Sequence, residues 1–171
     1  MKMHVFLFSL ILILPLIALR QGWTQTKQGP HAPVIIHTYA EDRGPYGIIW
    51  KIYMEAEDTD ADMDYIVVVV NQPGQGSYPP DRILLDPRHR NHLKGFLQWN
   101  TFSSKAGSLD EGTRITVRIS IIDKLGNESK EAVFPFTFGS GLRGQDKVPL
   151  PFSEDVPRIG YIGVDLVGST Q

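Results

Sequence analysis

Cysteine is absent from the 171 residues of this chain. The chain can therefore form no disulfide, thiolate nucleophile, zinc–cysteine site or lipid attachment through an N-terminal cysteine. An exported fold of this sequence has to be held together by packing alone. The length fits one domain with tails, because domains commonly run to about 100–200 residues.

An excess of positive charge is also absent. The chain carries 17 basic and 19 acidic residues, for a net charge of −2. Residues 1–24 contain Lys2 and Arg20 but no acid, so the remainder has a net charge of −4. Such a chain does not attract phosphate backbones or anionic membranes by its overall charge. We therefore expect no nucleic-acid partner.

No catalytic arrangement is recognisable in the sequence. Ser77, Ser103, Ser104 and Ser108 lie in loop-like segments, and none belongs to a G-x-S-x-G nucleophile motif. No nucleophile is paired with a base by a known spacing. The sequence predicts a protein that is not an enzyme.

The one long hydrophobic run lies at the N-terminus, where residues 5–19 are apolar apart from Ser9 and follow Lys2. This is the pattern of a secretory signal peptide, and the run is shorter than the roughly 20 residues of a spanning helix. Two interpretations remain open for residues 1–24: a signal peptide cleaved before Gln25, or an uncleaved N-terminal anchor. Both predict export to the periplasm or the extracellular space, with membrane attachment only in the second.

Helical periodicity is missing from the rest of the chain, which instead alternates with a period of two. After a polar linker at residues 25–33, Ile48–Ala56 and Arg114–Ile122 place apolar side chains on one face and polar side chains on the other. This pattern is typical of half-buried strands. The predicted strands cover residues 34–40, 48–56, 65–70, 93–101, 114–122 and 132–138, with a seventh near 82–85. We predict an all-β domain at residues 34–138, a seven-stranded antiparallel sandwich of the immunoglobulin-like kind.

Two turns carry a resemblance to a known group of modules. The segment Ile121–Ser129 contains a D-x-x-G-N-x-S turn, and Ala56–Asp62 contains an A-x-D-x-D-x-D turn. Both turns resemble those of bacterial immunoglobulin-like, fibronectin-III-like and cadherin-like β-sandwich modules. The resemblance implies a non-enzymatic interaction or structural module of the bacterial envelope or extracellular space. Its expected partner is another envelope or extracellular protein.

The acidic run has two interpretations. Asp58, Asp60, Asp62 and Asp64 occupy alternate positions, and a curled loop could bring their carboxylates together around calcium, which prefers six to eight oxygen ligands. Calcium is the one candidate cofactor. The other interpretation is a solvated turn in which aspartates accept hydrogen bonds from local amides.

Aromatic residues raise the question of carbohydrate binding. Trp50 and Trp99 lie on the apolar faces of their strands and are predicted core residues. Tyr53 and Phe96 fall on the opposite faces, so we expect them to be exposed candidates for ligand binding. A calcium- or carbohydrate-binding module is therefore the alternative to the interaction module.

The C-terminal residues 139–171 begin as a Gly/Pro-containing linker and end in an amphipathic segment. In an extended conformation Ile162, Val164 and Leu166 share one face. This short strand could pack against the edge of its own sheet. It could instead bind a partner protein by strand addition.

Overall fold

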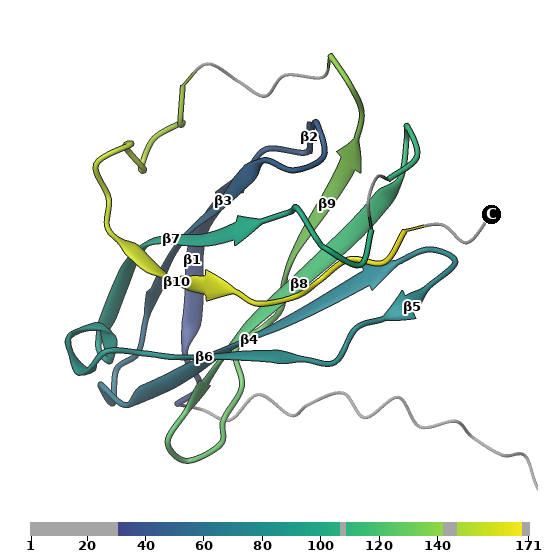
Figure 1. The fold of residues 1–171 in the computed structure, drawn as a ribbon. Coiled ribbons are helices and arrows are strands. Elements are labelled where there is room, and N and C mark those ends of the chain that lie inside the picture. The colour runs from purple at the N-terminus through teal and green to yellow at the C-terminus, as the bar shows by residue number, and fades with distance from the viewer. Residues whose placement is uncertain (1–30, 107–108, 142–146, 169–171) are drawn as a thin grey trace, which may run out of the picture.

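The computed structural model describes residues 31–106, 109–141 and 147–168, which fold almost entirely into β-strands (Figure 1). One 3-10 turn, η1 (Pro87–His89), interrupts them. The strands are β1 (Val34–Ala40), β2 (Arg43–Gly44), β3 (Ile49–Glu57), β4 (Met63–Gln72), β5 (Gly76–Ser77), β6 (Asp81–Leu84), β7 (His92–Asn100), β8 (Arg114–Asp123), β9 (Ala132–Phe138) and β10 (Arg158–Ile162). The predicted count of seven was approximate, because it left out the short strands β2 and β5 and set the tail strand apart.

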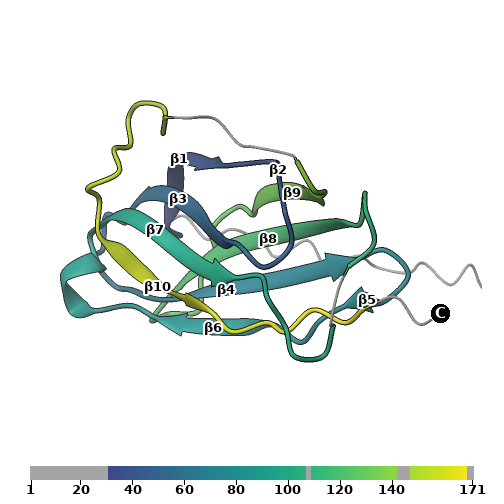
Figure 2. The same cartoon turned by 45° about the horizontal axis from the view of Figure 1, so that its top comes forward.

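The strands form two sheets that face each other, as the two layers in Figure 2 show. The first sheet has the order β1-β3-β7-β10, and the second has the order β2-β9-β8-β4-β5, with β6 also paired to β4. The cores of these sheets, β1-β3-β7 against β9-β8-β4, have the strand order of an immunoglobulin-like sandwich. The predicted fold class is confirmed.

Two pairs of strands depart from the antiparallel arrangement that the sequence predicted. β10 pairs with β7 in parallel, and β2 pairs with β9 in parallel. Parallel neighbours need a long connection between them, and both pairs join segments that are far apart in the sequence. Local alternation cannot reveal such pairings.

Alternation did identify the inner faces of the two sheets. Every second residue of β3 and β8 is at most 1% exposed: Trp50, Ile52, Met54 and Ala56 on β3, and Ile115, Val117, Ile119 and Ile121 on β8. Burying one such aliphatic side chain contributes about 1.5–3 kcal/mol to folding. The packing of these two faces against each other forms the core without a disulfide.

Two tryptophans at the centre of the core also form hydrogen bonds to segments at the two sides of the sandwich. Trp50 and Trp99 are cross-strand neighbours on β3 and β7, with ring centroids 6.1 Å apart. The indole Nε1 of Trp50 donates to the carbonyl of Glu41 at 3.0 Å, where the chain passes from β1 to β2. The indole Nε1 of Trp99 donates to the carbonyl of Val164 at 2.9 Å, in the tail.

The C-terminal tail is part of the sandwich. β10 lies between β7 and β6 in Figure 1, and the Asp81 carboxylate on β6 accepts a hydrogen bond from the backbone N–H of Gly163 at 2.7 Å. Ile162 and Leu166 are 5% and 0% exposed, and the half-buried Val164 packs on the same core. The tail therefore packs on its own domain, as the first of its two predicted alternatives has it, and the side chains of Ile162 and Leu166 are buried there.

The predicted signal or anchor at residues 1–24 lies outside the described residues. Within the described part of the chain, no helix is long and apolar enough to cross a membrane.

The close packing of β7 against the segment that leads into β10 predicts that two glycine-to-alanine substitutions differ in their effect on stability. A Cβ at Gly95 on β7 would lie 2.3 Å from the carbonyl oxygen of Pro157, which is backbone and cannot rotate away. We expect Gly95→Ala to lower the free energy of unfolding by about 1–3 kcal/mol, measured by chemical denaturation.

Gly163→Ala is the matched control, because its Cβ would lie at an ordinary 3.5 Å from Asp81 Oδ2. We expect it to change stability by less than about 0.5 kcal/mol. Equal effects of the two substitutions would contradict the close seating of β10.

Candidate functional site

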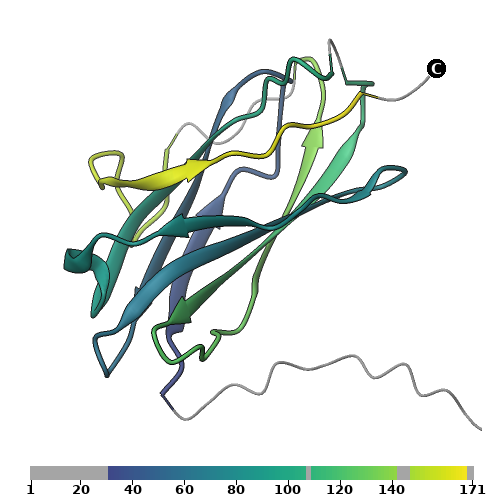
Figure 3. The same cartoon turned by 60° about the horizontal axis from the view of Figure 1, so that its bottom comes forward.

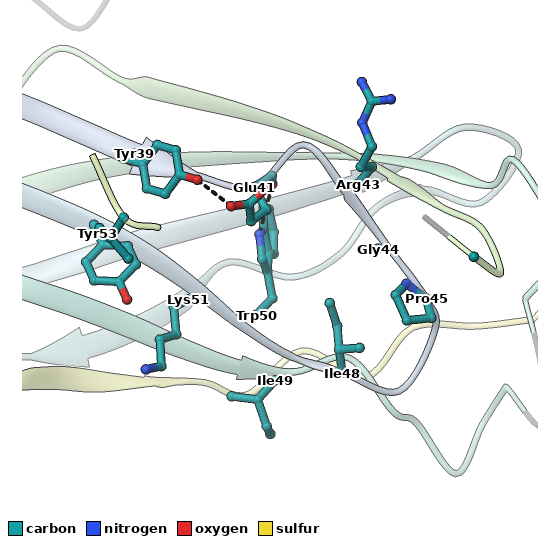
Figure 4. Close-up of a pocket in the computed structure, with 12 residues that line it drawn as sticks. Tyr39, Glu41, Arg43, Gly44, Pro45, Ile48, Ile49, Trp50, Lys51 and Tyr53 are labelled. Carbon is teal, nitrogen blue, oxygen red and sulfur yellow. Dashed lines mark hydrogen bonds between the residues drawn. The ribbon is translucent and has the colours of Figure 1, made fainter. Parts of the chain in front are cut away.

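The candidate site lies where the first strand leaves the first sheet. The ladder between β1 and β3 ends at the pair Ala40–Ile52, and after a short crossing β2 pairs with β9 of the second sheet. The start of β3 is therefore an open strand edge on that side. We call the hollow beside it the switch groove (Figure 4).

The open edge presents backbone groups as well as side chains. On the side of this edge that faces β7, the Ile48 carbonyl accepts a hydrogen bond from the N–H of Thr101 at 3.0 Å. Backbone groups of successive residues point to opposite sides of a strand. The N–H and C=O groups of Ile49 and Lys51 therefore point away from β7, toward the side that β1 has left.

The switch groove has a volume of about 520 Å³. Ligand pockets commonly have volumes of about 300–1,000 Å³, with mostly apolar and aromatic walls and a few polar groups. The described residues that line it include no Ser, Thr, Cys or His. They are Tyr39, Glu41, Arg43, Gly44, Pro45, Ile48, Ile49, Trp50, Lys51, Tyr53, Gly141 and Val148.

Two tyrosines form the aromatic wall of the switch groove. The rings of Tyr39 and Tyr53 are cross-strand neighbours with centroids 6.1 Å apart. Tyr53 is only 4% exposed, yet its hydroxyl has no hydrogen-bond partner among the described residues. Burial raises the pKa of Tyr53, and the charge of Glu154 raises it further. This hydroxyl stays neutral and keeps an unused donor.

The polar groups of the switch groove carry both signs of charge. The Tyr39 hydroxyl donates to the Glu41 carboxylate, as the dashed line in Figure 4 marks. Burial and this contact raise the pKa of Tyr39. The Lys51 ammonium lies 4.7 Å from the ring centroid of Phe96 and has no ion-pair partner in the described part of the chain. The arrangement can pack against a flat ring and form hydrogen bonds with its polar substituents.

The prediction that Tyr53 and Phe96 are exposed was wrong. They are 4% and 9% exposed, because residues 147–157, here called the strap, cross the outer face of the first sheet. Phe152 of the strap, itself 3% exposed, lies over Tyr53 with ring centroids 5.6 Å apart. Tyr53 still reaches the switch groove, whereas Phe96 does not line it.

Three residues of the switch groove were missed from the sequence. Lys51 shares the outward face of β3 with Tyr53, so the alternation could have identified it. Tyr39 and Glu41 lie on the strand end and crossing that wall the groove, and nothing in their local pattern signals that position.

The acidic run forms a turn in which aspartates accept hydrogen bonds from local amides. Asp58 is 3% exposed. Its carboxylate accepts hydrogen bonds from the backbone N–H groups of Asp60 and Asp62 at 3.2 and 3.1 Å. Asp64 lies on β4, where its carbonyl accepts the N–H of Leu85. Among the described residues, no group of three or more His, Asp or Glu side chains is arranged to hold a metal ion.

Asp123 makes the same kind of turn in the D-x-x-G-N-x-S segment. Its carboxylate accepts the N–H groups of Leu125 and Asn127 at 2.9 and 2.8 Å and the Asn127 amide at 2.8 Å. The two turns are adjacent, since the Asp62 carbonyl accepts the N–H of Lys124 at 3.1 Å. One carboxylate oxygen of Asp62 is covered and has no hydrogen-bond partner among the described residues.

Comparison with known proteins adds a likeness of fold. No family model and no curated protein matches the chain. One similar solved structure is the PKD domain of an M14-like peptidase from a Thermoplasmatales archaeon, with 15% identity, a TM-score of 0.39, and coverage of 63% of this chain and 96% of that one. Another is the CARDB domain of a Pyrococcus furiosus protein in complex with di-metal ions, with 9% identity, a TM-score of 0.33, and coverage of 66% and 90%.

The strap predicts a large effect for one aromatic substitution. Phe152→Ala removes the ring that covers Tyr53 and Phe96, and we expect it to lower the free energy of unfolding by about 3 kcal/mol, measured by denaturation. Leu150→Ala is the control from the same strap, because Leu150 is 92% exposed and its loss should leave stability unchanged. A wild-type stability for Phe152→Ala would show that the strap does not cover the sheet in solution.

The two turns predict that removing the charge of Asp62 raises the thermal stability of the protein, by an amount that depends on pH. Burial raises the pKa of Asp62, and the neighbouring Asp58 and Asp123 carboxylates raise it further. The folded chain then holds this proton more tightly than the unfolded chain, so stability falls as pH rises above the ordinary aspartate value. Asp62→Asn should raise the melting temperature at pH 7, and the gain should shrink toward pH 4. No gain at pH 7 would contradict this account.

The wild type and Asp62→Asn also test whether the turns bind calcium. Most oxygens of Asp58 and Asp123 are already used by local amides, so we expect equal melting temperatures for the wild type in calcium and in chelator. A ligand that binds only the folded state must raise its stability. A rise in calcium for the wild type that Asp62→Asn abolishes would establish a metal site.

Proposed function

We propose that this protein is an exported, non-enzymatic interaction module that binds a carbohydrate in the switch groove. The observation that carries this proposal is the Tyr53 hydroxyl, which belongs to a largely buried ring that lines the groove and has no hydrogen-bond partner among the described residues. Because no group of the described protein occupies this hydroxyl, it is free to donate a hydrogen bond to a ligand oxygen in the groove.

The chemistry of the other lining groups favours a sugar. Tyr39 and Tyr53 offer ring surface against which a pyranose ring can pack, and apolar contact with Ile49 and Val148 extends it. Lys51 supplies an ammonium donor and Glu41 a carboxylate acceptor. An uncharged ligand with many hydroxyl groups satisfies donors and acceptors of both kinds at once.

Export is supported by the sequence of residues 1–24, an apolar run after a short basic start. Glu41 is the one carboxylate among the described lining residues, whereas glycoside hydrolysis ordinarily uses a pair, and this supports binding rather than catalysis in the groove. A calcium-binding module is the weaker alternative, because the carboxylates of Asp58 and Asp123 already accept local hydrogen bonds.

The test is an NMR titration of the full chain with maltose, cellobiose and chitobiose. We expect at least one of them to shift the amide signals of Tyr39, Ile49 and Lys51. Tyr53→Phe removes only the hydroxyl, so it should weaken that sugar about three- to tenfold through the lost hydrogen bond and leave the fold intact.

Tyr161→Phe is the matched control, since Tyr161 is 56% exposed on β10 and does not line the groove. It should bind the sugar as the wild type does. Shifts confined to residues outside the groove, or no shift with any sugar, would refute the proposal.

A further inference from the structure

A second surface, separate from the switch groove, lies on the outer face of the second sheet. The side chains that alternate outward from β4 include Val67 and Val69, those from β8 include Arg114 and Arg118, and β9 adds Val133. Val133 is 56% exposed. Figure 3 shows β4 and β8 side by side in this sheet. With Arg82 of β6 these residues make up what we call the arginine face.

The register places an arginine between two valines at the centre of this face. Arg118 is the cross-strand neighbour of Val69 on one side and of Val133 on the other. Arg82 is the neighbour of Val67, and its guanidinium lies 5.4 Å from the ring centroid of Tyr65. Apolar side chains and guanidinium groups are therefore interleaved across the four strands β6, β4, β8 and β9.

The three arginines of the arginine face form no close ion pair among the described residues. Arg43, by contrast, pairs with Asp42, and Arg88 pairs with Asp86. The Nε of Arg118 is covered and has no hydrogen-bond acceptor among the described residues. The Glu128 carboxylate approaches the face, where it accepts a hydrogen bond from Ser120 Oγ at 2.6 Å.

The two outer faces of the sandwich differ in what covers them. The strap lies across the first sheet and buries Tyr53 and Phe96. On the second sheet Val133 and the arginines Arg82 and Arg114 remain exposed. The face that no described segment covers is therefore the one that combines exposed apolar side chains with arginines.

Its chemistry selects the kind of partner. Interfaces between proteins are enriched in arginine and aromatic residues around an apolar centre, and complementary charge selects the partner. A polyanion would use the arginines but would gain nothing from Val69 and Val133. We propose that the arginine face docks a protein partner whose surface combines carboxylates with apolar side chains.

The test uses a synthetic peptide that alternates glutamate with valine and phenylalanine, titrated into the full-length protein and followed by NMR. We expect it to shift the amide signals of Val69, Arg118 and Val133, and the same peptide with glutamine in place of glutamate to bind more weakly. Arg118→Gln should weaken the acidic peptide about tenfold, because a charge-assisted hydrogen bond is lost.

Two further variants complete the test. Arg88→Gln removes an exposed arginine outside this face and should bind as the wild type does. Val133→Ser should weaken the peptide about threefold, because its exposed apolar contact is lost. Wild-type binding by Arg118→Gln, or shifts that map to another surface, would overturn the proposal. Tighter binding of heparin that Val133→Ser leaves unchanged would overturn it in favour of a polyanion.

Discussion

The contact between Trp50 and Trp99 joins the parts of this fold that the chain order keeps apart. The two rings are cross-strand neighbours in the core. Each indole N–H donates a hydrogen bond to a backbone carbonyl at one side of the sandwich. One carbonyl belongs to Glu41, in the crossing between sheets, and the other to Val164, in the tail. A buried indole N–H needs a hydrogen-bond acceptor. The two tryptophans of the core therefore favour the positions that the β1–β2 crossing and the tail occupy. The switch groove exists because the first of these crossings leaves the edge of β3 open.

The tail and the strap together determine which surfaces are free. β10 occupies the edge of the first sheet beside β7, and the strap that leads to it places Phe152 on the outer face of that sheet. This aromatic cluster covers Tyr53 and Phe96 on the outer face of the first sheet. Among the described residues no such segment covers Val133 on the second sheet, so the arginine face and the switch groove are two separate exposed surfaces.

The two turns that carry the resemblance to bacterial immunoglobulin-like modules are local structures. Asp58 accepts hydrogen bonds from amides two and four residues later, and Asp123 does the same. Such short-range bonds explain why an aspartate recurs in turns of this kind whether or not a metal is bound. The two turns lie next to each other, so the Asp123 carboxylate adds to the charge environment that Asp58 and Asp60 of its own turn create around Asp62.

The alternation of residues such as Ile52 and Ile119 determined the strands, their inner faces and the class of fold, because a period of two depends only on local backbone geometry. Residue spacing likewise indicated the hydrogen-bonded turn at Asp58. Only the tertiary structure decided the parallel pairings, the burial of Tyr53 under Phe152 and the open edge of β3. These features join segments up to about a hundred residues apart, and such pairings are set by the packing of the whole chain, which no local pattern records.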